Sequence, residues 1–340
     1  MITPPADIQH ILDYTPWNNL RGMRLFLTGG TGFFGRWLLD SLTAANDRLG
    51  LEATAVVLTR DPTTFARTAP HLADRVDLGF HQGDVRTFDF PDGPFTHVLH
   101  AAADAGRTGE PLDVLDTVVG GTRRALDFAA ARGTKRFLLT SSGAVYGRQP
   151  PDLLHVPETF PGGPDPTDPR AVYGEGKRVA EAASCIIGRQ HGFAAIIARC
   201  WAFIGPHLPL DGPFAIGNFL RDAVAGRPVR VAHNGTAVRS YMHAADLTVW
   251  LWTLLANGPP RLPVNVGSVE PVSVGELARR VAALAGVGVE VAETPPPGEP
   301  AERYVPDVAR AAGLGLRMRI GLDDALARTF AAVAADRGAA

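Results

Sequence analysis

The chain has 340 residues, of which 46% are hydrophobic and 20% charged, and its formal net charge is −2. A chain of this length forms two domains or one large one. The near-neutral charge argues against a nucleic-acid-binding protein that relies on phosphate contacts, and the hydrophobic content argues against disorder. The only cysteines are Cys185 and Cys200, so we expect neither a disulfide framework nor a structural metal site.

The first 22 residues precede the main pattern and are expected to form an N-terminal helical extension, because Ile8, Ile11 and Leu12 have helical spacing. No basic segment followed by an apolar core marks a signal peptide here. The longest apolar stretch, residues 247–256, is too short to span a bilayer. These features predict a cytoplasmic protein with no membrane segment.

Strands and helices alternate from residue 23 onward. Residues 23–28 form a short apolar run typical of a buried parallel strand, and a glycine-rich turn and a helical pattern follow it. Further strands are predicted at residues 53–58, 76–80, 96–100, 136–140 and 195–199, and long helices at 112–131 and 173–191. This alternation predicts an α/β protein with a Rossmann-type doubly wound parallel sheet.

The pattern changes after Pro206, where proline and glycine separate shorter elements. Helices are predicted at residues 219–225, 245–255 and 276–284, and extended segments at 229–231 and 264–266. We interpret residues 23–205 as the domain that holds the sheet, which later segments of the chain re-enter. Residues 206–330 are expected to form a smaller C-terminal α/β domain.

The turn after the first strand has the spacing G-x-x-G-x-x-G. Glycines permit a tight turn and a close approach of the backbone to a pyrophosphate, and the N-terminus of the next helix offers free N–H groups to the phosphates. Because the turn lies between a predicted strand and a predicted helix, we expect it to bind a dinucleotide. The candidate cofactor-binding residues are Gly29, Thr31, Gly32, Phe33, Phe34 and Gly35.

Residues after the second and third strands bear on the choice between NAD and NADP. An acid at the end of the second strand hydrogen-bonds the 2′-hydroxyl of NAD, whereas an arginine suits the 2′-phosphate of NADP. Arg60 favours NADP, while the neighbouring Asp61 keeps NAD open, and simple solvation of Arg60 is the alternative. Asp84 and Val85 follow the third strand and are expected near the adenine, with turn capping by Asp84 as the alternative.

Tyr173 and Lys177 form a Y-x-x-x-K pattern within a predicted helix, so both side chains lie on one face. An ammonium beside a phenol favours the phenolate, so we expect Lys177 to lower the pKa of Tyr173, which then serves as a general base. Lys177 is also suited to holding the nicotinamide ribose. Ser142 ends the fifth strand, at the sheet edge where ligands bind. We expect it to exchange a proton with Tyr173, and a turn-capping role is the alternative.

Together these residues resemble the extended short-chain dehydrogenase/reductase family, in its nucleotide-sugar epimerase/dehydratase branch. The resemblance covers about residues 23–325. Besides the glycine turn, Ser142 and the Tyr173–Lys177 pattern, the similar segments are Gly83 to Val85, His100 to Ala103, Arg199 to Pro206, Arg239 to Asp246, and Arg303 to Asp307.

The resemblance implies an enzyme that holds NAD or NADP on residues 23–205, with Ala101, Ala102 and Ala103 as further cofactor contacts. It implies a nucleoside-diphosphate sugar as substrate, bound mainly by residues 206–330. The family's enzymes commonly form homodimers through two helices, here residues 112–131 and 173–191. No nucleic acid or membrane partner is implied.

Substrate contacts also follow from the resemblance. Arg239 and Arg303 are expected at the diphosphate, because an arginine fork matches phosphate geometry. Asn218 is a candidate for the same pocket, and Ser142 is a candidate for the sugar. Asp104 lies where family members approach the substrate, although a loop carboxylate is an equally good interpretation.

The residues after Ser142 limit which of the family's reactions we expect this chain to catalyse. Family members that act as 4,6-dehydratases carry an acid there, whereas this chain has Gly143 and Ala144, which do not titrate. We therefore expect an epimerase acting at C4 through a transient 4-keto sugar. The alternative is an NADPH-dependent 4-ketoreductase, which uses the same residues. A dehydratase is less favoured because no acid follows Ser142. A dinucleotide-binding protein without catalysis is less favoured because it would not need Ser142, Tyr173 and Lys177 together.

Overall fold

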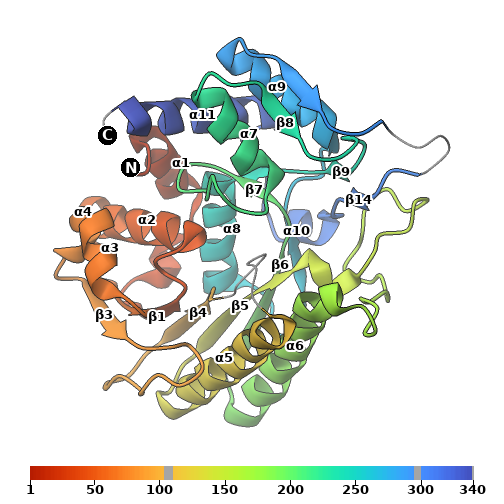
Figure 1. The fold of residues 1–340 in the computed structure, drawn as a ribbon. Coiled ribbons are helices and arrows are strands. Elements are labelled where there is room, and N and C mark those ends of the chain that lie inside the picture. The colour runs from red at the N-terminus through yellow and green to blue at the C-terminus, as the bar shows by residue number, and fades with distance from the viewer. Residues whose placement is uncertain (103–109, 295–299, 339–340) are drawn as a thin grey trace.

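The computed structural model describes residues 1–102, 110–294 and 300–338. A seven-stranded parallel sheet forms its centre (Figure 1). Its strands are β1 Arg24–Thr28, β2 Thr54–Thr59, β3 Leu78–Gln82, β4 His97–His100, β5 Arg136–Ser142, β6 Ala194–Cys200 and β11 Val264–Val266. They lie side by side in the order β11-β6-β5-β4-β1-β2-β3. The predicted doubly wound parallel sheet is confirmed.

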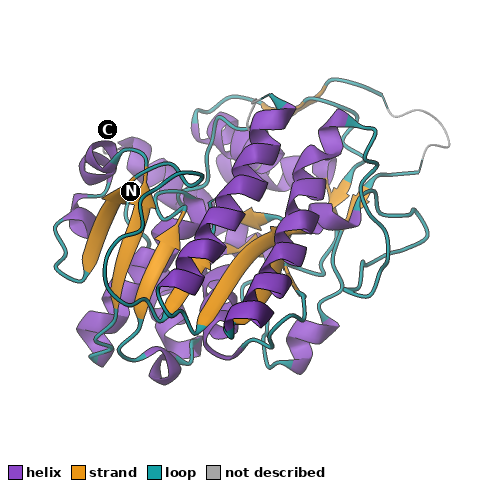
Figure 2. Ribbon diagram, turned by 90° about the horizontal axis from the view of Figure 1, so that it is seen from below, coloured by secondary structure: helices purple, strands orange, loops and turns teal. Residues whose placement is uncertain are grey.

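Helices cover both faces of the sheet. On one face α5 (Pro111–Ala131) and α6 (Val172–His191) lie side by side, as Figure 2 shows. On the other face α2 (Phe33–Leu49) packs beside α8 (Ala244–Asn257). Successive side chains of a strand point to opposite faces. Phe26 of β1 therefore packs into the core under α5, while Leu25 and Leu27 pack into the larger core under α2 and α8.

Several element boundaries differ from the prediction, and two of these differences have a clear local reason. The third strand begins at Leu78 rather than at Val76, whose side chain is fully exposed in the turn after α4 (Pro70–Ala73). The N-terminal helix α1 (Pro5–Tyr14) ends before Pro16, because the residue before a proline disfavours helical backbone. A separate single turn of 3₁₀ helix, η1 (Trp17–Leu20), follows. The remaining short elements of the first half are α3 (Pro62–Thr68), η2 (Gly143–Tyr146) and η3 (Pro169–Ala171).

The second half of the chain builds three small sheets beside the large one. Two-residue strands β7 (Phe203–Ile204) and β10 (Met242–His243) pair with each other, as do β8 (Val229–Val231) and β13 (Val289–Val291). The third sheet has the order β12-β9-β14, built from β12 (Val272–Ser273), β9 (Val238–Arg239) and β14 (Arg303–Tyr304). The helices here are α7 (Ala215–Val224), α9 (Val274–Ala285), α10 (Ala309–Gly313) and α11 (Leu322–Gly338).

Strand β11 returns from this second half to the edge of the central sheet beside β6. The boundary near residue 205 and the extent of the second domain stay predictions. Over the three described ranges, no helix combines the length and the apolar character needed to cross a bilayer.

Candidate active site

The glycine turn between β1 and α2 is built so that only glycine fits. Gly29 has φ +73°, and a Cβ added there would lie 2.6 Å from the carbonyl carbon of Ala101. At Gly35, the added Cβ would lie 2.2 Å from the carbonyl of Gly30. Helix α2 begins at Phe33, and no described side chain caps its first turn. This backbone cradle with free N–H groups fits a pyrophosphate, as the sequence predicts.

The end of β4 is fixed against this turn by a buried polar pair. Thr28 Oγ1 lies 2.7 Å from His100 Nδ1 and accepts a hydrogen bond from the N–H of Ala102 at 3.1 Å. Burial lowers the pKa of His100 to about 3, so the ring is neutral. Ala101 and Ala102 therefore line the turn, whereas the predicted site residues Ala103 and Asp104 lie outside the described residues.

The candidate residues for the adenosine end lie after β2 and β3. Arg60 is exposed and close enough to Asp84 to help lower the pKa of that carboxyl, although Arg86 is the main cause. Arg86 Nε donates to Asp84 at 2.8 Å. Asp61 accepts a hydrogen bond from the N–H of Thr64 at 2.9 Å and thereby caps α3, so this carboxylate already has a structural role.

The side chain of Val85 packs against α5. Its side chain contacts Gly121 so closely that a Cβ at position 121 would lie 2.9 Å from Val85 Cγ1. The charged side chains near Asp84 at this corner of the sheet are Arg86, which contacts it directly, and Arg60.

Ser142, Tyr173 and Lys177 converge where β5 ends beside the start of α6. Lys177 is buried, and its Nζ donates to the carbonyl oxygen of Thr140 at 2.8 Å. Ser142 lies close enough to Tyr173 for its hydroxyl to stabilise the phenolate and so oppose the rise in the pKa of Tyr173. Ser142 Oγ also accepts from the N–H of Ala144 at 3.1 Å. The serine therefore caps η2 as well as facing the tyrosine.

The predicted direction of the Tyr173 pKa shift is wrong for this structure. Burial is the largest influence and raises the pKa of Tyr173 above its usual value. The Lys177 Nζ lies 5.7 Å from the centroid of the Tyr173 ring, and its own pKa falls to about 8 because its charge is also desolvated. A positive charge nearer the phenol is needed before Tyr173 can act as a base near neutral pH.

The three candidate substrate residues of the second half are not gathered at one point. Arg239 of β9 donates to Glu302 Oε1 at 2.9 Å, and its guanidinium lies 6.0 Å from the ring centroid of Tyr304. Arg303 precedes Tyr304 in β14 and so points to the opposite face, with Nη2 3.5 Å from the carbonyl oxygen of Leu154.

Asn218 has local partners. Its Nδ2 donates to the carbonyl oxygen of Gly212 at 3.0 Å, and its Oδ1 accepts from Arg221 at 3.2 Å. Asn218 therefore braces the loop before α7. Of the three candidates, Arg239 is the one beside Tyr304.

Tyr304 is a site residue that sequence reasoning did not single out. A Cβ added at Gly143 would lie 2.6 Å from the Tyr304 hydroxyl oxygen, so this phenol stands directly over the glycine that follows Ser142. Its ring packs on Trp201, with 4.4 Å between centroids. The Arg-Tyr pair at 303–304 is part of the family resemblance, but nothing local in the sequence indicates which of the two points into the site.

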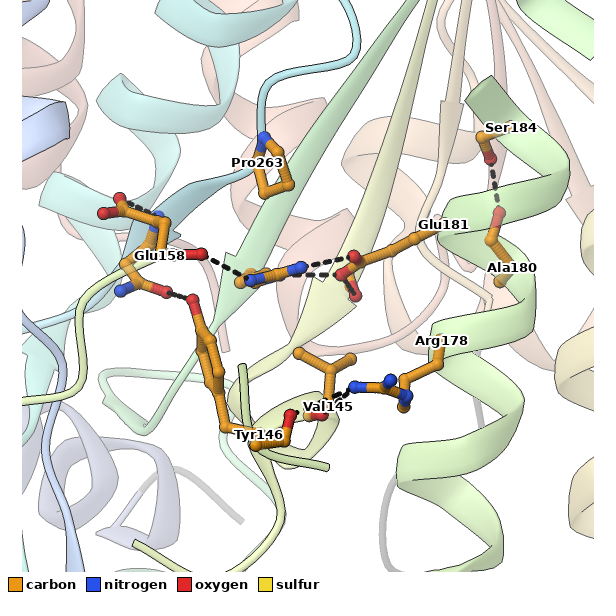
Figure 3. Close-up of polar contacts among 12 residues, drawn as sticks. Val145, Tyr146, Glu158, Arg178, Ala180, Glu181, Ser184 and Pro263 are labelled. Carbon is orange, nitrogen blue, oxygen red and sulfur yellow. Dashed lines mark hydrogen bonds and ion pairs between the residues drawn. The ribbon is translucent and has the colours of Figure 1, made fainter. Parts of the chain in front are cut away.

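A buried polar network supports the floor of the site. Arg199 of β6 makes two hydrogen bonds to Glu181 of α6, at 3.0 and 2.7 Å, and Ser141 also donates to Glu181. Asn265 Oδ1 accepts from the Tyr146 hydroxyl at 2.9 Å and from Trp201 Nε1 at 3.2 Å. The contacts of Tyr146 and Glu181 are drawn in Figure 3. The network fixes Trp201, and through it the ring of Tyr304.

A glycine-rich turn, a partly buried tyrosine near a buried lysine, and a serine at the carboxyl edge of a parallel sheet are features of a nicotinamide-dependent enzyme fold. The model of the NAD dependent epimerase/dehydratase family matches residues 25–267. The chain belongs to this family.

Relatives and solved structures agree with this assignment. UDP-glucuronic acid decarboxylase 6 of Arabidopsis thaliana is 31% identical over 292 residues, which cover 85% of this chain and 82% of the relative. UDP-glucuronic acid decarboxylase 1 of Xenopus tropicalis is 29% identical and covers 90% of this chain and 71% of its own length. The UDP-glucose 4-epimerase of Thermus thermophilus, solved with NAD, has a TM-score of 0.75 at 26% identity over 94% of this chain and all of that one.

Proposed function

We propose that the protein is a nucleotide-sugar epimerase that acts at C4 of the sugar through a transient 4-keto intermediate. The observation that carries the proposal is the convergence of Ser142 and Tyr173 at the sheet edge that also holds the glycine turn. Gly143 and Ala144, which follow Ser142, offer no side chain that could remove a proton from C5. Oxidation and re-reduction at C4 therefore suit the site better than 4,6-dehydration.

Each catalytic residue has a defined task in this reaction. Tyr173 removes the proton of the C4 hydroxyl, and Ser142 donates a hydrogen bond to the same oxygen. A nicotinamide held by the glycine turn and Lys177 would supply a reversible hydride acceptor for C4, so that epimerisation needs no net oxidation. In its oxidised form it would also place a positive charge near the phenol of Tyr173, which favours the phenolate. Lys177 reinforces this charge and is suited to binding the nicotinamide ribose.

Cofactor and partner choices follow from side chains at the edges of the site. The exposed Arg60 supports NADP, since Asp61 is engaged as a helix cap. Arg239, beside Tyr304, is the best-placed candidate for the substrate diphosphate. The exposed apolar side chains Val179 and Ile186 of α6 support a homodimer through α5 and α6.

Two other reactions involve a 4-keto sugar at the same site. A 4-ketoreductase, which consumes NADPH and uses Tyr173 as an acid, is favoured by Arg60. Decarboxylation of a nucleotide uronic acid is favoured by the similarity to UDP-glucuronic acid decarboxylases. Once C4 of that substrate has been oxidised by hydride transfer, the ketone is β to the carboxylate on C5, so the bond to CO₂ can break with its electrons moving to the ketone oxygen. Protonation at C5 and return of the hydride to C4 would then complete a reaction with no net oxidation by the cofactor.

Identification of the co-purifying dinucleotide and a substrate panel test the proposal. Protein purified without added cofactor is denatured, and the released dinucleotide is counted by mass spectrometry. Near-stoichiometric dinucleotide and interconversion of UDP-glucose and UDP-galactose, or of another C4 pair of nucleotide sugars, support the epimerase.

Other outcomes select the alternatives. An empty protein that prefers NADPH and reduces 4-keto sugars is the reductase, and release of CO₂ from UDP-glucuronic acid identifies the decarboxylase. Tyr173→Phe should lower kcat about 10²- to 10⁴-fold in each case, whereas a variant with full activity would contradict all three.

A further inference from the structure

Tyr304 occupies the space that a side chain at position 143 would need. A Cβ there would lie 2.6 Å from the Tyr304 hydroxyl and 2.7 Å from Cδ2 of Trp201. Any residue other than glycine would therefore displace the phenol, the indole or both. Gly143 thus admits a second tyrosine to the immediate neighbourhood of Ser142.

Contacts with distant segments of the chain fix the position of the Tyr304 phenol. The parallel pairing of β14 with β9 aligns Tyr304 with Arg239, whose guanidinium lies over the phenol ring. On its other side the ring contacts Trp201, which is itself held by Asn265. A ring clamped in this way loses little further rotamer entropy when its hydroxyl makes a hydrogen bond.

The number of hydrogen bonds that Ser142 can make determines how a hydrogen bond from Tyr304 would orient the Ser142 hydroxyl. A serine hydroxyl has one donor and two acceptor positions. The N–H of Ala144 fills one acceptor position at 3.1 Å. If a second O–H fills the other, the only remaining capacity of Ser142 is its single hydrogen, which is then free to donate to the sugar oxygen.

We propose that Tyr304 is a positioning residue whose hydroxyl donates to Ser142 Oγ, so that Ser142 acts only as a hydrogen-bond donor to the reacting oxygen. Tyr304 acts through Ser142 and needs no contact with the substrate for this role. The proposal rests on the proposed function for its catalytic consequence, but the Tyr304–Ser142 contact itself does not depend on which nucleotide sugar is bound.

The contact is tested without any sugar. The chain has five tyrosines, so the ζ-carbon resonance of each can be assigned by Phe substitution in ¹³C-labelled protein. Hydroxyl exchange is read from the deuterium isotope shift on that carbon. We expect slow exchange at Tyr304 in the wild type and at least about tenfold faster exchange in Ser142→Ala. Equal exchange rates in the two proteins would overturn the proposal.

The catalytic consequence is tested by a double-mutant cycle. Tyr304→Phe keeps the ring on Trp201, and we expect it to lower kcat about tenfold with little change in KM. In the Ser142→Ala background the same change should alter kcat less than about twofold, because its target is gone. An equal loss in both backgrounds, or an effect on KM alone, would show that Tyr304 does not act through Ser142.

The matched control is Tyr14→Phe, because Tyr14 is exposed on α1 with its ring against Arg319. It should leave the kinetics and the Tyr304 resonance unchanged. If the wild type converts no nucleotide sugar, the proposed function fails, and the exchange measurement still decides whether Tyr304 donates to Ser142.

Discussion

The Lys177 ammonium donates to the carbonyl oxygen of Thr140 at 2.8 Å while lying 5.7 Å from the ring centroid of Tyr173. The lysine is therefore anchored to strand β5, one turn of helix from the tyrosine that it serves. Its charge is buried without a carboxylate partner in direct contact among the described residues. This arrangement makes the stability of the protein depend on pH at that one side chain.

The substitution Lys177→Met should remove this pH dependence of the stability. The folded-state pKa of Lys177 is about 8, against 10.5 for the ordinary lysine, so the unfolded chain binds more protons between these pH values. Lys177 therefore contributes a gain in stability as pH rises through this window, and the variant lacks this contribution. From pH 7 to 10.5 the difference in free energy of unfolding should shift toward the wild type by about 3 kcal/mol.

Chemical denaturation over a pH series measures this shift. The control is Lys135→Met, because Lys135 is exposed and is the only other lysine of the chain. Its difference from the wild type should stay flat. A flat difference for Lys177→Met as well would mean that the buried ammonium keeps its ordinary pKa.

Gly29→Ala should abolish dinucleotide binding. The new Cβ would meet the Ala101 carbonyl at 2.6 Å with φ at +73°, so the turn must open. We expect an affinity loss of at least about 100-fold in calorimetric titration with NAD and NADP, and a stability loss of about 1–3 kcal/mol. Gly50→Ala separates the two effects, since Gly50 has φ +58° but no described atom within 4 Å of its added Cβ. It should lose stability and keep binding.

Glu181→Gln should be one of the most destabilising single changes near the site. It leaves the guanidinium of Arg199 buried without its carboxylate, which accepts hydrogen bonds at 3.0 and 2.7 Å. The expected loss is about 3–5 kcal/mol in urea denaturation. Asp127→Asn removes the exposed partner of Arg123 and should cost less than about 1 kcal/mol. Similar losses for both variants would contradict the structural role of the buried pair.

Arg60→Ala should weaken NADP binding more than NAD binding. An exposed arginine at the end of β2 gains most from a 2′-phosphate, so we expect NADP affinity to fall about tenfold and NAD affinity to change little. Fluorescence titration with each reduced cofactor measures the ratio. Arg67→Ala, on the neighbouring helix α3, is the charge-matched control. If wild type and Arg60→Ala bind NADP with equal affinity, the argument that Arg60 selects NADP is wrong.

Much of the fold and part of the site could be predicted from local signals in the sequence. The buried strands are visible as apolar runs, the cofactor turn follows from glycine spacing between a strand and a helix, and Tyr173 and Lys177 share a face because α-helices repeat every 3.6 residues. These features depend on residues that are close together along the chain, so they could be predicted from the sequence.

The tertiary structure decided what depends on distant segments. The placement of Tyr304 over Gly143 needs the pairing of β14 with β9 and the ring of Trp201. The direction of the Tyr173 pKa shift follows from burial, which no local pattern gives. The sequence by itself determined a parallel sheet with a glycine-rich turn after its first strand, and it placed Ser142, Tyr173 and Lys177 at the edge of that sheet. Only packing decided which second phenol joins them, because burial and long-range pairing arise when the whole chain has folded.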